Sequence, residues 1–421
     1  MRIIRRKIEL KRVEGPGWKM LYGRRKTGKT FLVQNFTDYD EFFFVGRDGT
    51  VYDRINGGTL TVGEFMNLFP RLLKGGNVVV DEFHRLPGRF LDILHAHAGT
   101  GEMTLITSTL WLARRTLLGS ESPLLGIVRP LQVGLIDERE IIVELSREVA
   151  GRELIEASSY LREPLLVPIY KKPIREFLTD YLHSSGSMVK ELIGEAFTEE
   201  ERELTAIYEA VMKGVADGKE TSTELSSLLF SRGLIEKDNP GVLQRYLAIL
   251  AGMGILRKIQ VVGKKRKKFV YRHASPLLDL HFYLEAKYAY TELETPREFI
   301  RKTVDEKVPR HVEDFIESLL AKIYGLRPVR IEKPQLELDV ALEGFKKLEL
   351  VGEVKWKNRV KGEEVKRIED KLGKFSCRKV LIVPSAEVLE KKPEGIEILT
   401  PEDLLGLARE SLENAVKPQD P

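Results

Sequence analysis

The 421-residue sequence contains one cysteine, Cys377, which excludes an internal disulfide framework and a zinc site built from several cysteines. It has no apolar run of about eighteen residues, and its amino-terminal stretch lacks the apolar centre of an export signal. We therefore expect a cytoplasmic protein with no membrane partner. The chain also has little excess charge of either sign, because it contains 68 Lys+Arg and 64 Asp+Glu. Any basic surface for nucleic acid must therefore be local.

What is present favours packed domains. Hydrophobic residues make up 42% of the chain and charged residues 31%, which argues against a disordered chain. Short β-branched or aromatic segments at 17–22, 42–45, 77–80 and 103–107 alternate with helical patterns. This alternation is typical of an α/β fold with a parallel sheet.

A glycine-containing loop follows the first of these strands and opens a helix. It matches the Walker A pattern G-x-x-x-x-G-K-T, in which backbone N–H groups and the helix dipole hold phosphates. We expect Lys29 to reach the β- and γ-phosphates of ATP and the Thr30 hydroxyl to bind Mg²⁺. The predicted ATP-binding residues are Gly23, Arg24, Arg25, Lys26, Thr27, Gly28, Lys29 and Thr30.

Two acids end the apolar strand at 78–80. Asp81 is predicted to hold Mg²⁺, and Glu82 to orient or deprotonate the attacking water. Ser108 or Thr109, at the end of the next strand, is a candidate sensor of the γ-phosphate, although such hydroxyls often bond only to backbone. Arg129 is either an arginine finger or a solvated side chain. His84, His95 and His97 have no acid or cysteine at ligand spacing that favours zinc.

The middle of the chain combines helices with a basic hairpin. Helical patterns cover 201–212, the capping box Thr221-x-x-Glu224 and a helix starting at Asn239-Pro240. Strands at 255–262 and 269–272 follow, and together these elements predict a winged helix-turn-helix. Its basic residues favour double-stranded DNA as a partner, whereas a solvated edge or a protein-docking module are the alternatives. The candidate nucleic-acid contacts are Gln244, Arg245, Lys264, Lys265, Arg266, Lys267 and Lys268.

Strands predicted at 337–342 and 348–354 carry a further charged set. Glu353 and Lys355 share one face of a strand, because the side-chain period is two. Asp339 on the neighbouring strand can meet them. Two carboxylates and one ammonium suit Mg²⁺-dependent phosphodiester cleavage. Alternating charge on half-exposed strands produces the same pattern without function.

Three segments together carry a family resemblance: Gly-Arg-Arg-Lys-Thr-Gly-Lys-Thr at 23–30, Val-Val-Asp-Glu-Phe-His-Arg-Leu at 79–86, and Ser-Pro-Leu-Leu-Gly at 122–126. With them the chain resembles the archaeal P-loop ATPase family, which is similar to the STAND and AAA+ classes. The resemblance implies ATP binding at 23–30, a winged helix and a carboxyl-terminal domain like a PD-(D/E)xK nuclease. It also places Glu313 as a further acid of that nuclease site. A Gly-Gly-x-Pro-like segment is not recognisable in 137–198, and the sensor is Ser-Thr where the family tends to have Gly-Ser.

We therefore predict an α/β P-loop NTPase domain with a parallel sheet, a helical region, a winged helix-turn-helix and an α/β restriction-endonuclease-like domain. The expected ranges are 1–136 for the ATPase core, 137–198 for a helical lid or linker, 199–290 for the winged helix and 300–414 for the nuclease-like domain. The expected function is ATP hydrolysis associated with nucleic acid, with a possible Mg²⁺-dependent nuclease. The alternative is a STAND-like nucleotide switch or scaffold. A homo-oligomer is possible on either interpretation.

Overall fold

The computed structural model describes residues 2–110, 113, 119, 122–200, 202–263, 268–331 and 337–417. Lys264, Lys265, Arg266 and Lys267 of the basic hairpin lie outside the described residues. The helices are α1 (Lys7–Val13), α2 (Lys29–Phe36), α3 (Val62–Gly75), α4 (Arg89–Ala96), α5 (Glu138–Leu145), α6 (Gly151–Tyr160), α7 (Ile174–Glu199), α8 (Ala206–Ala216), α9 (Ser222–Ser231), α10 (Pro240–Gly252), α11 (Pro276–Tyr288), α12 (Arg297–Tyr324), α13 (Gly362–Leu372) and α14 (Pro401–Val416). The strands are β1 (Trp18–Tyr22), β2 (Glu41–Val45), β3 (Val51–Asp53), β4 (Thr59–Leu60), β5 (Asn77–Asp81), β6 (Glu102–Thr107), β7 (Arg129–Gln132), β8 (Leu256–Val262), β9 (Lys268–His273), β10 (Arg327–Ile331), β11 (Val340–Glu343), β12 (Leu348–Val354), β13 (Arg378–Ile382) and β14 (Glu397–Leu399).

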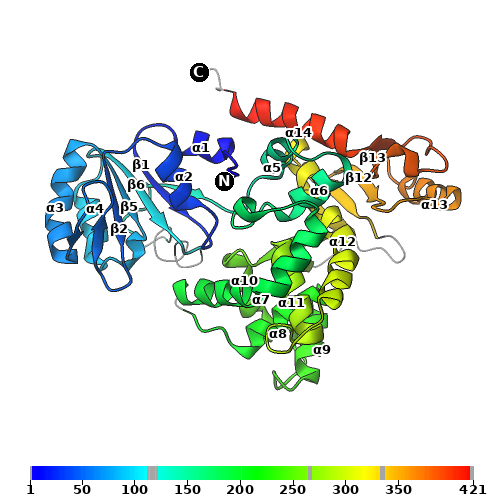
Figure 1. Cartoon of the computed structure of the whole chain (residues 1–421), viewed down its shortest axis with the longest axis horizontal. Helices are drawn as coiled ribbons and strands as arrows, with labels where there is room; N and C mark the ends of the chain where they lie inside the picture. Colours follow the sequence, from blue (N-terminus) through cyan, green and yellow to red (C-terminus); the bar gives the residue numbers. More distant parts are fainter. Residues whose placement is uncertain are drawn as a thin grey trace.

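The amino-terminal part is a mixed α/β layer structure with a largely parallel sheet, as the sequence predicts. Its strand order is β4-β3-β2-β5-β6-β1-β7, and β2, β5, β6, β1 and β7 run parallel. Strands β1 and β5 are buried along almost their whole length and are mostly apolar because both faces of the sheet are covered. Helices α3 and α4 pack on one face and α1 and α2 on the other, as Figure 1 shows.

The strand order positions the candidate site. Strand β6 lies between β1, which leads into the phosphate-binding loop, and β5, which ends at Asp81. The carboxyl ends of these three parallel strands therefore meet at one edge of the sheet. Ligands of open α/β sheets bind at such an edge.

The helices in the middle of the chain have other bounds than the helical patterns of the sequence. Helix α7 spans 26 residues to Glu199 with a kink at Ser185, and α8 begins at Ala206. The Arg202 N–H bonds the Phe197 carbonyl at 2.9 Å, which turns the chain out of the helix. Helix α12 spans 28 residues and contains Pro309. Packing of α12 against α5, α6, α7 and α11 keeps it continuous through the proline.

A second sheet joins the hairpin to the carboxyl-terminal strands, in the order β14-β13-β12-β11-β10-β8-β9. Strand β8 pairs antiparallel with β9 and parallel with β10. Strand β11 begins at Val340, later than the expected residue 337, because the Asp339 carboxylate accepts the Val354 N–H at 2.8 Å in place of a ladder bond. Helix α13 packs on one face of this sheet, and α12 and α14 pack on the other.

The two ends of the chain lie close together. Helix α14, drawn in red along the top of Figure 1, packs against α5 and α1. The Lys11 ammonium donates to the Ala415 carbonyl at 3.1 Å. Among the residues that the structure covers, no helix is long and apolar enough to cross a membrane.

Candidate functional site

The loop at residues 23–30 leads from β1 into α2. Gly28 adopts φ +84°, a left-handed conformation that favours glycine, and its carbonyl accepts the Leu32 N–H to begin α2. A Cβ on Gly23 would lie 2.1 Å from the Val133 carbonyl oxygen, so the close approach of β7 requires glycine there. The loop is braced from outside by Arg6, which is buried and donates to the Thr27 carbonyl at 2.7 Å.

Lys29 and Thr30, the first two residues of α2, bond to the loop and to the acidic strand end respectively. The Lys29 ammonium donates to the Gly23 and Arg24 carbonyls at 2.8 and 3.0 Å. Burial lowers the pKa of Lys29 to about 8. The Thr30 hydroxyl donates to Asp81 Oδ2 at 2.8 Å, and burial together with the Glu82 charge raises the pKa of Asp81 to about 6. A divalent ion at this position would favour the ionised carboxylate.

Glu82 and Ser108 form a hydrogen-bonded pair at the ends of neighbouring strands. Glu82 Oε2 accepts from the Ser108 hydroxyl at 2.9 Å and from its N–H at 3.2 Å. Glu82 directly follows Asp81, the last residue of β5, and its φ of +55° lies in the left-handed region. Its side chain reaches Ser108, which follows β6. The structure therefore brings Asp81, Glu82 and Ser108 to one edge of the sheet, although Ser108 faces the acid.

A cavity of about 390 Å³ connects these groups with an apolar wall. It is lined by residues 25–30, Glu82 and Ser108, and by apolar side chains that include Ile4, Phe36, Ile136, Pro164 and Val167. The cavity thus offers polar groups suited to phosphates and apolar groups suited to a nucleobase.

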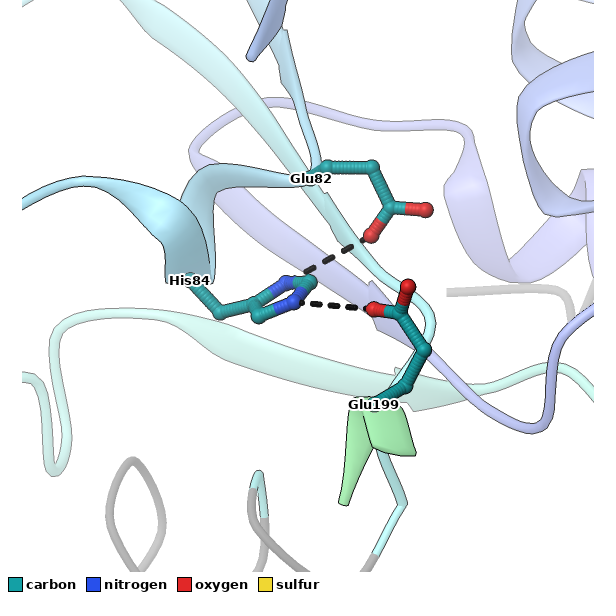
Figure 2. Close-up of side chains that lie close together, drawn as sticks. All are labelled: Glu82, His84 and Glu199. Atoms are coloured by element: carbon teal, nitrogen blue, oxygen red, sulfur yellow. Dashed lines mark hydrogen bonds and ion pairs between the residues drawn. The ribbon is translucent and has the colours of Figure 1, made fainter. Parts of the chain in front are cut away.

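Glu199, the last residue of α7, reaches into this edge of the sheet. His84 Nε2 lies 3.2 Å from Glu199 Oε2, and His84 Nδ1 lies 3.4 Å from Glu82 Oε2 (Figure 2). One potential ligand atom from each of Glu82, His84 and Glu199 lies within 4.8 Å of the others, the spacing of a metal site. Arginine side chains also contact Glu199, however, and their charge opposes a bound cation. The hydrogen bond from His84 and the neighbouring arginine hold the pKa of Glu199 well below its usual range.

The other predicted nucleotide-site residues lie at varied distances from the loop. Arg24 is paired with buried Glu163 at 2.6 Å, and Lys26 is exposed. Arg129 pairs with Lys19 near the start of β1, toward the opposite edge of the sheet from the loop. Its guanidinium donates to the Glu14 carbonyl at 2.9 Å. Within one copy of the chain, Arg129 is therefore not beside the phosphate-binding loop.

A second charged cluster lies on the carboxyl-terminal sheet. The Lys355 ammonium contacts Glu353 Oε2 at 2.8 Å and Asp339 Oδ2 at 3.2 Å, and Asp339 and Glu353 raise the pKa of Lys355 although burial opposes this. Burial and the Asp339 charge raise the pKa of Glu313 to about 7. Lys371 on α13 also contacts Glu353, at 2.5 Å. The structure thus gathers Asp339, Glu353 and Lys355, with Glu313 within electrostatic reach.

Three of the predicted nucleic-acid contacts lie among the described residues. Gln244 and Arg245 are exposed on α10, and Lys268 is half-buried at the start of β9. Thr221, at the start of α9, forms a bridge with Val270 and ties that helix to β9. Helices α8, α9 and α10 followed by the β8–β9 hairpin match the element order predicted from the sequence.

Several side chains around the 390 Å³ cavity were not predicted from the sequence. The amino-terminal segment around Ile4 and Arg6, and the segment from Pro164 to Pro168, line the cavity. The prolines were the only visible signal for the second segment. Glu199 had no signal, because it follows His84 by 115 positions and belongs to no motif.

Comparisons with known proteins give a weak likeness. The chain is similar to the Aeropyrum pernix ORC2 protein in ADPNP-ADP complexes (14% identity, 72% of this chain and 91% of that chain, TM-score 0.37). It is also similar to the Aeropyrum pernix ORC1 protein in complex with DNA (14%, 69% and 95%, TM-score 0.28) and to the Thermotoga maritima RuvB Holliday junction branch migration motor (17%, 69% and 92%, TM-score 0.29). No protein-family model and no curated protein matches the sequence. At these TM-scores the likeness does not indicate what this chain binds or does.

Proposed function

We propose that the protein binds ATP with Mg²⁺ and hydrolyses it. The observation that carries this proposal is the direct hydrogen bond between Thr30 and Asp81, which joins the phosphate-binding loop to the acidic strand end across 51 residues of sequence. An ion held by these two groups would also meet the β- and γ-phosphates, since Lys29 and the loop amides line the same cavity.

The cavity supports a division of roles along the nucleotide. The loop amides and Lys29 hold the phosphates at the amino terminus of α2. The base would contact the apolar side chains of the amino-terminal segment and of Pro164–Pro168. Glu82 would orient the attacking water once it leaves Ser108, and Ser108 would then be free to contact the γ-phosphate.

We further propose that the protein acts on nucleic acid. The helices α8–α10 and the hairpin would form the winged helix, with Gln244 and Arg245 exposed for contact with double-stranded DNA. The cluster of Asp339, Glu353 and Lys355 supports a Mg²⁺-dependent nuclease centre, because its acids can bind a metal and its ammonium can steady developing negative charge.

ATP turnover with and without DNA tests the first proposal. We expect phosphate release that is lost in Lys29→Ala and stimulated by double-stranded DNA. Lys74→Ala, an exposed lysine of α3, is the matched control and should behave as wild type. Affinity for DNA should fall steeply between about 50 and 200 mM salt. The absence of turnover with any nucleoside triphosphate would refute the ATPase proposal.

A cleavage assay on the same DNA tests the nuclease centre separately. We expect Mg²⁺- or Mn²⁺-dependent nicking that is lost in Asp339→Ala and retained in Asp370→Ala, an exposed acid of α13. If no metal supports nicking of any DNA, the carboxyl-terminal domain is a binding module.

One observation favours a slower nucleotide switch as the second candidate. Glu82 is engaged by Ser108 and lies beside His84, so the residue needed to orient water is held away from that role. A switch would show a single slow turnover without response to DNA, and tight retention of ADP.

A further inference from the structure

The Glu199 carboxylate is surrounded by positive groups from three different strand ends. Its Oε1 accepts from Arg25 at 3.0 Å, from Arg85 at 3.0 Å and from Arg47 at 3.3 Å. Its side chain is only 5% exposed, whereas that of Arg47 is 60% exposed. Arg25 and Arg47 also contact the Glu195 carboxylate, at 3.0 and 3.9 Å. Three guanidinium groups therefore face two carboxylates, and their positive charge exceeds the negative charge of this pair.

The second oxygen of Glu199 is held by groups beside the proposed catalytic acid. Figure 2 shows the His84 ring beside the Glu199 carboxylate. His84 Nε2 lies 3.2 Å from Oε2, and the Ser108 hydroxyl lies 3.1 Å from it. The same Ser108 hydroxyl lies 2.9 Å from Glu82. The Ser108 hydroxyl thus bridges Glu199 and Glu82, the residue proposed to orient water.

This arrangement is that of an anion site. Guanidinium groups match the oxygens of phosphate as well as those of a carboxylate, and arginine is the side chain that most often recognises phosphate with several hydrogen bonds. A divalent ion bound to Glu199 would lie beside three guanidinium groups, which disfavours a metal centre at the Glu82, His84 and Glu199 cluster.

The anion site adjoins the nucleotide cavity on the side of Glu82. Arg25 belongs to the phosphate-binding loop and lines the 390 Å³ cavity together with Glu82. The same two residues line a neighbouring cavity of about 590 Å³, whose wall includes Arg47 and Arg85. A triphosphate that extends past Lys29 toward Glu82 would therefore bring its last phosphate to the arginines.

We propose that Arg25, Arg47, Arg85 and His84 bind the terminal phosphate of a nucleoside triphosphate, and that Glu199 occupies this site as its built-in competitor. The inference rests on the proposed nucleotide-binding function. Because a triphosphate and the Glu199 carboxylate need the same donors, binding of ATP requires the end of α7 to leave the sheet edge. ADP lacks the competing phosphate and leaves the contact in place.

Displacement of Glu199 would reach the helices that follow. Glu200, next along the chain, is buried and accepts the Leu110 N–H after β6. The two consecutive carboxylates therefore fasten the end of α7 to the strand ends of the first sheet. Their release would free the connection to α8, the first helix of the proposed nucleic-acid-binding unit.

The test compares the affinities for ATPγS and ADP, both with Mg²⁺, by calorimetry on the full chain. Wild type should bind both nucleotides and Lys29→Ala neither, which establishes the underlying function first. In Glu199→Gln we expect ATPγS to bind at least about ten-fold more tightly, as when a binding-competent state that is only about one-tenth populated becomes the main state. ADP affinity should change less than about two-fold. Glu191→Gln, an exposed glutamate on the same helix, is the control and should alter neither value.

A second variant separates phosphate binding from a general loosening of the fold. Arg47→Gln in the Glu199→Gln background should remove part of the gain for ATPγS without affecting ADP, and exposed Arg47 can be replaced without disturbing a core. Hydrogen exchange at residues 186–199 should increase with ATPγS and not with ADP in wild type. If Glu199→Gln changes both affinities by the same factor, or neither, the inference is overturned while the proposed function stands. If wild type binds neither nucleotide, both fall together.

Discussion

Replacement of Lys29 by methionine should stabilise the protein measured without nucleotide. Burial lowers the pKa of Lys29 from 10.5 to about 8. Each pKa unit corresponds to about 1.4 kcal/mol, so keeping the ammonium charged at neutral pH costs the fold about 3 kcal/mol. Methionine retains the length and apolar stem of the side chain but deprives the Gly23 and Arg24 carbonyls of a donor, at about 1 kcal/mol each. The two lost hydrogen bonds offset about 2 of these 3 kcal/mol, so we expect the free energy of unfolding to rise by about 1 kcal/mol.

The stability difference between the variant and wild type should depend on pH. Between pH 8 and 10.5 the unfolded chain binds more protons than the folded one, so the stability of wild type rises with pH across that window. The Lys29→Met variant lacks this rise, and its advantage should fade toward pH 10.5. Urea unfolding at several pH values, followed by tryptophan fluorescence from buried Trp18 and the other indoles, measures both quantities. A variant that is less stable at pH 7, or an advantage that does not depend on pH, would refute the reasoning.

Three further predictions concern the braces and acids of the two sites. Arg6→Ala should lower the free energy of unfolding by about 3–5 kcal/mol, because it leaves the buried carboxylate of Glu9 unpaired, and urea unfolding beside the exposed-site variant Arg12→Ala measures this. An unchanged midpoint would contradict it. The Mg²⁺ dependence of nucleotide affinity should weaken as pH falls through about 6, since protons then compete with the ion for Asp81. Calorimetry should show this pH dependence in wild type and its absence in Asp81→Asn. Mn²⁺ binding to the carboxyl-terminal cluster should weaken below about pH 7, because Glu313 must lose a proton, and Glu313→Gln should remove that pH dependence. Metal affinity that is constant from pH 6 to pH 8 in wild type would show that Glu313 is not a ligand.

The sequence predicts the first sheet better than the rest of the fold. Helices cover both sides of the sheet, so the side chains at 77–80 and 103–107 are mostly apolar on both faces. A short run of mostly apolar residues can be recognised in the sequence. The long helices α7 and α12 are not predictable in the same way. Pro309 suggests a break, but tertiary packing on both sides of it keeps the helix intact. The pairing of β8 with β10 is equally invisible, because it joins segments about 70 residues apart with no shared pattern.

The residues of the candidate sites also differ in how far the sequence predicts them. Residues within a motif, such as Lys29, Thr30 and Asp81, could be assigned because phosphate chemistry fixes their spacing and their place at strand ends. Asp339, Glu353 and Lys355 could be grouped because strand periodicity places two of them on one face. Glu199 and Lys371 could not, since each arrives from a separate helix whose position depends on packing across the whole chain.

The shared second sheet makes the proposed DNA-binding hairpin and the proposed nuclease strands a single mechanical body. Each neighbouring pair of strands from β9 through β8, β10 and β11 to β12 is joined by backbone hydrogen bonds. A displacement of the hairpin would therefore also move the strands that carry the acids. The unit cannot be excised at residue 290 without consequence. Such a fragment would bare the edge of β8, a seven-residue strand with buried Ile259 and Val261, and would self-associate through it.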